Sequence, residues 1–218
     1  MKIAMILAAG RGERLRPVTD TVPKALVEGC GEKLIDRHIR MLAAAGVDNI
    51  VINLGWLGER IVEHVGSGER YGVQVVYSPE YDNVLETGGG IHRALPMLGK
   101  APFWVVNADI HTDFDIGSDS LPVDADAELV LVPTPAHKKN DDFLLKDGRV
   151  RNGDGPGYTY AGIARYRPSF FEACEAGRFS VVPLMRAAAD AGKLAGRVYA
   201  GHWQDVGTPE RLADLNRR

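Results

Sequence analysis

Short apolar runs alternate with longer amphipathic stretches as far as Pro133, and this alternation constrains the fold more than any other feature of the sequence. The apolar runs have the length of strands, whereas the amphipathic stretches repeat their apolar residues at helical spacing. The predicted strands cover 3–8, 49–54, 73–77, 103–107 and 128–133, and the predicted helices cover 33–45, 57–65 and 89–98. Such alternation is typical of a parallel sheet with helices on its faces. The sequence therefore predicts an α/β fold with a Rossmann-like, mostly parallel mixed sheet flanked by helices.

Turn signals replace this alternation in the last third of the chain. The elements predicted there are a hairpin over 143–150 with its turn at Lys146-Asp147-Gly148-Arg149, a strand over 158–166, helical stretches after Arg167-Pro168 and Val182-Pro183, and a last helix from Thr208-Pro209. The charged, small-residue stretch 121–128 is the expected boundary between two lobes of a single domain, about 1–120 and 121–218.

The composition excludes several classes of protein. A net charge of −3 leaves no basic excess for gripping a nucleic acid, so no nucleic-acid partner is expected. The apolar start of the chain reaches Gly10 before it attains the length of a membrane span, so neither a signal peptide nor a membrane anchor is expected. Cys30 and Cys174 lie far apart, as in proteins of a reducing compartment, and the histidines lack metalloenzyme spacing. The cysteines therefore favour a cytoplasmic location, and the histidines give no support to a zinc site.

The segment behind the first predicted strand, 7–24, has the composition of a phosphate-binding loop. Gly10 and Gly12 would let backbone amides approach phosphate oxygens closely. Four basic residues accompany them, Arg11, Arg14, Arg16 and Lys24. The segment is neither a dinucleotide fingerprint, which needs a third glycine where Leu15 stands, nor a P-loop, which needs Gly-Lys-Ser or Gly-Lys-Thr. Taken alone, the two glycines are better explained by a tight turn beside solvated arginines.

Two aspartates occupy positions suited to a magnesium ion, which prefers one or two carboxylates and substrate phosphates. Asp109 follows the apolar strand 103–107, at the sheet edge where ligands bind in open α/β sheets. Asp205 lies between Trp203 and the start of the last helix. Either carboxylate could instead cap a local turn, and the residues alone do not decide between these roles.

The string from Leu7 to Lys24 resembles the sugar-nucleotide pyrophosphorylase family, whose opening pattern is Leu-Ala-Ala-Gly-x-Gly-x-Arg-Leu/Met-x-Pro-x-Thr-x-x-x-Pro-Lys, at every fixed position. The resemblance implies a nucleotidyltransferase fold similar to that of GT-A enzymes, with a nucleotide-binding lobe followed by a sugar-binding lobe. It implies that Ala9, Gly10, Gly12 and Glu13 surround the nucleotide, that Arg14 steadies the β- and γ-phosphates, and that Lys24 contacts phosphate at the reacting end.

The same resemblance assigns the remaining site residues. It implies that Asp109 and Asp205 hold Mg²⁺, with Asp109 joining Arg14 and Lys24 as catalytic residues. The string Leu85-Glu86-Thr87-Gly88-Gly89-Gly90 is similar to the family loop against the nucleobase, through Leu85, Glu86 and Gly88. The candidate sugar contacts are Asn107, Asp141, Asn152 and Gly162, although relatives usually present glycine where this chain has Asp141. The loop 136–142, with His137, Lys138 and Lys139, is a candidate mobile cover.

The resemblance implies transfer of a nucleoside monophosphate from an NTP to a sugar 1-phosphate, with release of pyrophosphate. UTP is the favoured donor and N-acetylmuramic acid α-1-phosphate the favoured acceptor, in cell-wall recycling. Two alternatives remain, a mannose- or glucose-1-phosphate nucleotidyltransferase using GTP, UTP or dTTP, and a non-catalytic regulatory subunit that binds nucleotide sugars. The sequence leaves the oligomeric state open, and a monomer is compatible with it.

Overall fold

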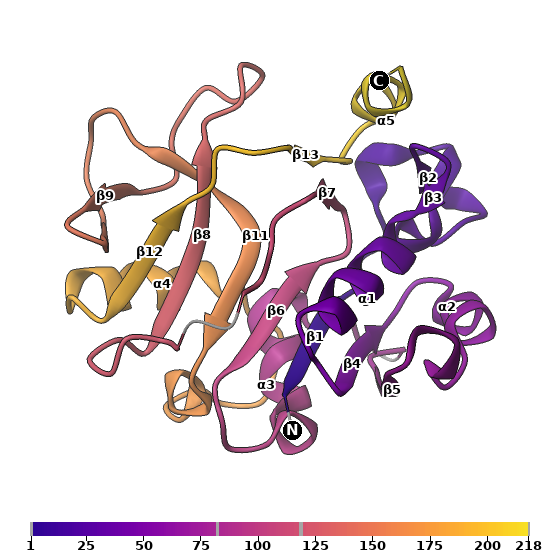
Figure 1. Cartoon of the computed structure of the whole chain (residues 1–218), viewed down its shortest axis with the longest axis horizontal. Coiled ribbons are helices and arrows are strands. Elements are labelled where there is room, and N and C mark those ends of the chain that lie inside the picture. Colours follow the sequence, from indigo (N-terminus) through magenta and orange to yellow (C-terminus); the bar gives the residue numbers. More distant parts are fainter. Residues whose placement is uncertain (1, 82, 118–119, 218) are drawn as a thin grey trace.

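A mixed sheet forms the centre of the molecule (Figure 1). The computed structural model describes residues 2–81, 83–117 and 120–217, and within these ranges the sheet has nine strands in the order β5-β4-β1-β6-β11-β8-β12-β10-β9. The strands are β1 Ile3–Leu7, β4 Asn49–Leu54, β5 Gln74–Pro79, β6 Phe103–Asn107, β8 Ala127–Pro133, β9 Leu144–Lys146, β10 Arg149–Arg151, β11 Tyr158–Tyr166 and β12 Leu194–Val198. The first four neighbours, β5 to β6, are parallel, so their carboxyl ends share one edge of the sheet.

Helices cover both faces of this sheet (Figure 1). Helices α1 (Leu34–Ala44) and α2 (Gly58–Val65) pack on one face, and α3 (Glu86–Leu98) and α4 (Val182–Asp190) on the other. Alternate residues of β1 separate accordingly, because side chains of a strand point to opposite faces in turn. Ile6 belongs to the core with α1, and Met5 to the core with α3. The predicted α/β fold, with a mixed sheet flanked by helices, is confirmed.

Two short ribbons lie outside the main sheet. In one, β7 (Ile110–Thr112) pairs antiparallel with β13 (Trp203–Asp205), and in the other, β2 (Glu28–Gly29) pairs with β3 (Glu32–Lys33). The sequence pattern predicts neither ribbon, because strands of two or three residues show no periodicity. It also leaves out β12, a five-residue strand.

Single 3-10 turns complete the chain at η1 Glu13–Leu15, η2 Val18–Asp20, η3 Lys24–Leu26, η4 Glu69–Tyr71 and η5 Pro168–Phe171. The helical stretch expected after Arg167-Pro168 is only η5, so that prediction is wrong in extent. The predicted hairpin is confirmed, with Asp147 and Gly148 at φ values of 51° and 73° as its turn requires.

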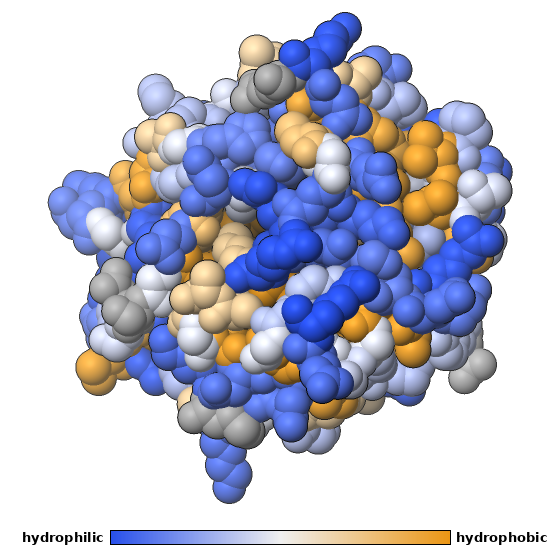
Figure 2. Space-filling model, turned by 45° about the vertical axis from the view of Figure 1, so that its right-hand side comes forward, coloured by the Kyte–Doolittle hydropathy of each residue, from blue (hydrophilic) through white to orange (hydrophobic). Residues whose placement is uncertain are grey.

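The last helix, α5 (Pro209–Asn216), begins as predicted. The hydroxyl oxygen of Thr208 accepts a hydrogen bond from the Arg211 amide, and Pro209 occupies the first turn. The face of the molecule in Figure 2 is mostly hydrophilic, with apolar residues in separate small groups. Within the described residues, no helix has both the length and the apolar character needed to cross a membrane.

Candidate active site

The loop behind β1 contains two glycines with different roles, Gly12 and Gly10. Gly12 has a φ of 70°, and a Cβ there would lie 2.9 Å from the Thr19 side chain. The Thr19 hydroxyl donates a hydrogen bond to the Gly12 carbonyl at 2.9 Å, which closes the loop. A Cβ on Gly10 would meet nothing within 4 Å. Gly12 therefore shapes the loop, whereas Gly10 leaves room beside the chain for another molecule.

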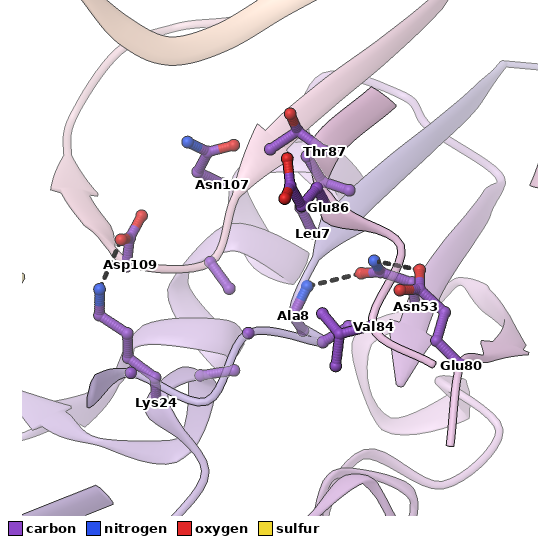
Figure 3. Close-up of a pocket in the computed structure, with 15 residues that line it drawn as sticks. Leu7, Ala8, Lys24, Asn53, Glu80, Val84, Glu86, Thr87, Asn107 and Asp109 are labelled. Atoms are coloured by element: carbon purple, nitrogen blue, oxygen red, sulfur yellow. Dashed lines mark hydrogen bonds and ion pairs between the residues drawn. The ribbon is translucent and has the colours of Figure 1, made fainter. Parts of the chain in front are cut away.

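The first cavity opens at the carboxyl ends of β1, β4 and β6 (Figure 3). It is lined by Leu7, Ala8, Ala9, Gly10, Gly12, Lys24, Ala25, Asn53, Glu80, Val84, Glu86, Thr87, Asn107, Ala108 and Asp109. Five residues predicted to bind nucleotide are therefore brought together here, namely Ala9, Gly10, Gly12, Lys24 and Glu86. Ligands bind at this edge in open α/β sheets.

A buried pair absent from the sequence predictions, Asn53 and Glu80, joins the two loops of the first cavity (Figure 3). The Asn53 carbonyl accepts a hydrogen bond from the Ala8 amide at 2.6 Å, and its amide group donates to Glu80 at 2.8 Å. The other carboxylate oxygen of Glu80 accepts a hydrogen bond from the Leu85 amide at 2.9 Å. The pair thus sets the distance between the glycine loop and the start of α3. Their positions, next to last in β4 for Asn53 and directly after β5 for Glu80, place both at the carboxyl edge of the sheet.

The glycines of the Leu85–Gly90 string serve packing inside α3. A Cβ on Gly88 would lie 2.4 Å from the Phe179 ring, and a Cβ on Gly90 would lie 2.7 Å from a Glu80 carboxylate oxygen. The Gly88 amide donates a hydrogen bond to the Phe179 carbonyl at 2.9 Å. Gly88 and Leu85 do not line the first cavity, whereas Glu86 does. Close packing explains why Gly88 and Gly90 lack side chains, and contact of this string with a nucleobase stays a prediction.

Lys24 and Asp109 lie at the centre of the site (Figure 3). Lys24 Nζ donates to Asp109 Oδ2 at 2.5 Å, and both side chains are largely shielded from solvent, with exposures of 14% and 32%. Asp109 and Asn107 line the first cavity and also a second one beside it. A group bound in one cavity would therefore meet a group bound in the other at these two side chains.

The second cavity lies between the β7–β13 ribbon, β11 and the loop after β8. It is lined by Arg14, Asn107, Asp109, Ile110, Pro135, His137, Lys138, Lys139, Thr159, Tyr160, Ala161, Gly162, Trp203, Asp205 and Arg211. Burial raises the pKa of Tyr160, so its hydroxyl stays protonated and neutral at physiological pH. Five of these residues are basic and two are carboxylates, so the lining attracts anions.

The ribbon brings Asp205 beside Asp109. Asp205 lies opposite Ile110 in the ladder, and the Val206 amide donates to the Asp109 carbonyl at 2.7 Å. One oxygen of Asp205, Oδ2, forms an ion pair with Arg211. The other, Oδ1, is buried without a hydrogen-bond partner, 3.5 Å from His137 Nε2. Two neighbouring carboxylates, one with a buried oxygen that accepts no hydrogen bond, are chemically suited to a divalent cation.

Gly162 lies at an irregularity of β11, where the pairing with β8 shifts register between Tyr160 and Ala164. Its φ is 76°, and a Cβ there would lie 2.9 Å from the amide nitrogen of Asn107. The indole of Trp203 donates to the neighbouring Ala161 carbonyl at 2.8 Å. Gly162 and Asn107, two predicted sugar contacts, are therefore packed together at the second cavity.

Besides Leu85 and Gly88, three further predicted site residues do not line either cavity. Glu13 forms ion pairs with Arg11 and Arg16 on the outside of the glycine loop. Asp141 accepts the Gly157 amide at 2.6 Å, and hydrogen bonds from the Thr134 hydroxyl and this amide lower its pKa. The third, Asn152, hydrogen-bonds to the Arg186 carbonyl and to Asp190, which ties β10 to α4. The structure thus gives each of the three a contact within the protein.

His38 is a buried titratable residue that the sequence analysis did not single out. It lies on α1 on the same side of the sheet as the ribbon, and its side chain is fully buried. Burial lowers its pKa to about 4, although the negative charge of Asp109 acts in the opposite direction. His38 is therefore uncharged at neutral pH, on the helix that packs against β7.

Comparison with known proteins agrees with this geometry. The model of the nucleotidyl transferase family matches residues 3–141. The chain is 47% identical to the N-acetylmuramate alpha-1-phosphate uridylyltransferase of Neisseria meningitidis serogroup B over 97% of this chain and 95% of that protein. It is 36% identical to the protein of the same name from Caulobacter vibrioides, over 96% and 93%.

Solved structures share the fold. HddC from Yersinia pseudotuberculosis superposes with a TM-score of 0.80 at 23% identity, covering 100% of this chain and 99% of that chain. The similarity of the fold extends over the whole chain. The resemblance noted in the sequence is thus confirmed. The chain belongs to the nucleotidyl transferase family and is an enzyme of its sugar-1-phosphate nucleotidyltransferase group.

Proposed function

We propose that this enzyme transfers UMP from UTP to N-acetylmuramic acid α-1-phosphate, releasing pyrophosphate. The observation that carries the proposal is the meeting of the two cavities at Asn107 and Asp109, beside Lys24. A donor in the first cavity and an acceptor in the second would place their phosphates at this junction. The two relatives that match over nearly their whole length carry the name of this activity, which supports the choice of donor and acceptor.

The proposed reaction is an in-line displacement at phosphorus. An oxygen of the acceptor phosphate attacks the α-phosphorus of UTP, and the bond from that phosphorus to the bridging oxygen of the β-phosphate breaks. Pyrophosphate leaves with the electron pair. The acceptor phosphate is already an anion, so the protein has to position two anions and offset their charge rather than remove a proton.

The basic residues of the site suit this task. Lys24 Nζ, which contacts Asp109 at 2.5 Å, lies where the α-phosphate and the acceptor phosphate would meet. Arg14 lines the second cavity from the glycine loop, and we propose that it extends to the departing β- and γ-phosphates at the junction. Fixed positive charges at these positions stabilise the charge that develops in the transition state. Asn107, held against Gly162, offers amide hydrogen bonds at the junction.

We propose Asp109 and Asp205 as the residues that hold Mg²⁺. Magnesium is typically held by one or two carboxylates, and substrate phosphates and water fill its other positions. Within the part of the chain that the structure describes, no group of three or more acidic, histidine or cysteine side chains forms a metal cluster, which agrees with such a two-carboxylate site. The buried Oδ1 of Asp205, without a hydrogen-bond partner, is the donor atom that most needs a cation. When bound, the ion neutralises phosphate charge and orients the reacting phosphates.

We further propose a cytoplasmic location and a role in recycling cell-wall sugars. Cys30 and Cys174 are free thiols in the structure, which agrees with a reducing compartment. The acceptor named for the relatives is a cell-wall sugar, which supports the role.

Pyrophosphate release tests the proposed function. The purified chain is incubated with each of four NTPs and with muramyl, glucosyl, mannosyl or glucosaminyl 1-phosphate, with and without MgCl₂. We expect the highest kcat/KM for UTP with N-acetylmuramic acid α-1-phosphate, and no release without the metal. Preference for GTP with mannose 1-phosphate would replace the proposed substrates. Absence of release with every pair would overturn the proposed reaction.

A further inference from the structure

The second cavity contains a basic loop that the transfer of UMP does not by itself require. The loop connects β8 to β9 and extends beyond the end of β8 (Figure 1), and it contributes His137, Lys138 and Lys139 to the cavity. Lys24 and Arg14, from the glycine loop, already provide positive charge for the reacting phosphates. The loop therefore adds charge on another side of the acceptor cavity.

Contacts at both ends hold this loop in place. Its start is tied to β11 by the hydroxyl pair Thr134–Thr159 at 3.1 Å, and the Lys138 amide closes a turn on the Pro135 carbonyl at 2.9 Å. At its end, Asp142 accepts the Tyr160 amide at 2.9 Å and also forms an ion pair with Lys138. The turn is thus fixed to the strand that carries Tyr160 and Gly162, so its backbone stays beside the cavity.

One basic side chain of the loop between β8 and β9 has no charged partner among the described residues of the second cavity. Arg211 pairs with Asp205, and the ammonium of Lys138 pairs with Asp142. His137 lies 3.5 Å from Asp205. Lys139 has neither a hydrogen-bond nor an ion-pair partner among the residues that the structure describes, and its side chain is exposed at the cavity. A second anionic group on the acceptor would be the natural partner of this ammonium.

We propose that Lys139 binds a carboxylate of the acceptor and so selects acidic sugar 1-phosphates over neutral ones. The inference rests on the proposed function, because N-acetylmuramic acid carries a lactyl carboxylate on the ring in addition to its 1-phosphate. With the phosphate at the Asn107–Asp109 junction, the rest of the sugar extends into the second cavity, toward the loop. Lys139 is then a specificity residue that contacts the acceptor away from the reacting atoms.

The test compares two acceptors that differ in the carboxylate. N-acetylglucosamine α-1-phosphate has the same ring, N-acetyl group and phosphate as the muramyl acceptor but lacks the lactyl group. The variants are K139M, the charge-retaining K139R, and K146M, which removes an exposed lysine from the end of β9 as a matched control. Pyrophosphate release with UTP and MgCl₂ gives kcat/KM for each acceptor, and inhibition of the muramyl reaction gives the affinity of the glucosamine compound.

For K139M we expect kcat/KM for the muramyl acceptor to fall about tenfold, because a charge-assisted hydrogen bond is typically worth that factor or more. In K139M, the kcat/KM and the inhibition constant of N-acetylglucosamine 1-phosphate should not change, nor should the KM for UTP. K139R and K146M should have the kinetic constants of the wild type. An equal loss for both acceptors would assign Lys139 to phosphate, and no loss would remove it from the acceptor; either result overturns the inference. Failure of the wild-type enzyme to use the muramyl acceptor at all would instead overturn the proposed function.

Discussion

Replacing His38 by glutamine should flatten the pH dependence of stability in the acid range. His38 is fully buried on α1, and burial lowers its pKa from 6.5 to about 4. Above pH 6.5 the residue is neutral in both the folded and the unfolded chain. Between pH 6.5 and 4, the unfolded chain binds a proton that the folded chain does not, so the free energy of unfolding decreases as the pH falls. Below pH 4, His38 is protonated in both the folded and the unfolded chain, so its contribution to the free energy of unfolding no longer changes with pH.

The size of the effect follows from the difference between the two pKa values. Protonation linkage amounts to about 1.4 kcal/mol per pH unit of difference, so the shift from 6.5 to about 4 corresponds to roughly 3 kcal/mol. Small domains have total stabilities of about 5–15 kcal/mol, so a loss of this size is a large fraction of the whole. Glutamine has no protonation step in this range, so H38Q should lack the effect, whatever its stability at pH 7.

Urea unfolding, followed by circular dichroism at pH 7, 6, 5 and 4, measures this difference. Carboxylates also lose their interactions as the pH falls, but they do so in both proteins. The difference in the free energy of unfolding between wild type and H38Q therefore isolates His38. We expect the wild type to lose about 3 kcal/mol more than H38Q between pH 7 and pH 4. Parallel curves for the two proteins would refute the argument that His38 is held neutral by burial.

Three further substitutions test the site. Asp205→Asn should remove most turnover without changing the melting temperature, and an unchanged rate in MgCl₂ titrations would place the metal elsewhere. Gly162→Ala should raise the KM for both substrates, because its Cβ would displace Asn107, which lines both cavities; unchanged KM values would contradict the close contact of Gly162 with Asn107. Asn53→Leu should lower the free energy of unfolding in urea by about 3 kcal/mol, because the buried Glu80 carboxylate loses the hydrogen bond from the Asn53 amide. An unchanged free energy of unfolding would contradict the role of this pair.

Local backbone requirements account for what could be predicted from the sequence. A turn behind β1 could be anticipated because glycine readily adopts a positive φ, such as the 70° of Gly12, whereas its assignment as a phosphate-binding loop depends on the family resemblance. The turn at Asp147-Gly148 and the cap at Thr208 are local in the same sense. Such features depend on a few consecutive residues, so their signal is present in the sequence itself.

Packing partners could not be predicted in this way. The sequence predicts Gly88 in a loop against the nucleobase but gives no sign of the Phe179 ring, which leaves no space for a Cβ at this position. Asn53 and Glu80 come from different strands, and only the order of β1, β4 and β5 in the sheet brings them to the glycine loop. Asp141 does not line either cavity, because its carboxylate accepts the Gly157 amide.

The proximity of Asp109 and Asp205 shows why the family resemblance predicts this site whereas the hydrophobic periodicity does not. The two residues are far apart in the sequence and meet because β7 and β13 form a three-residue ladder, too short to be predicted from alternation. In that ladder Asp205 lies opposite Ile110, and the Val206 amide binds the Asp109 carbonyl. Because side chains alternate between the two faces of a strand, a slip of one residue would turn Asp205 away from Asp109. The short string from Trp203 to Gly207 therefore has to keep both its residues and its length, which explains why a motif identifies this site where a hydrophobic pattern cannot.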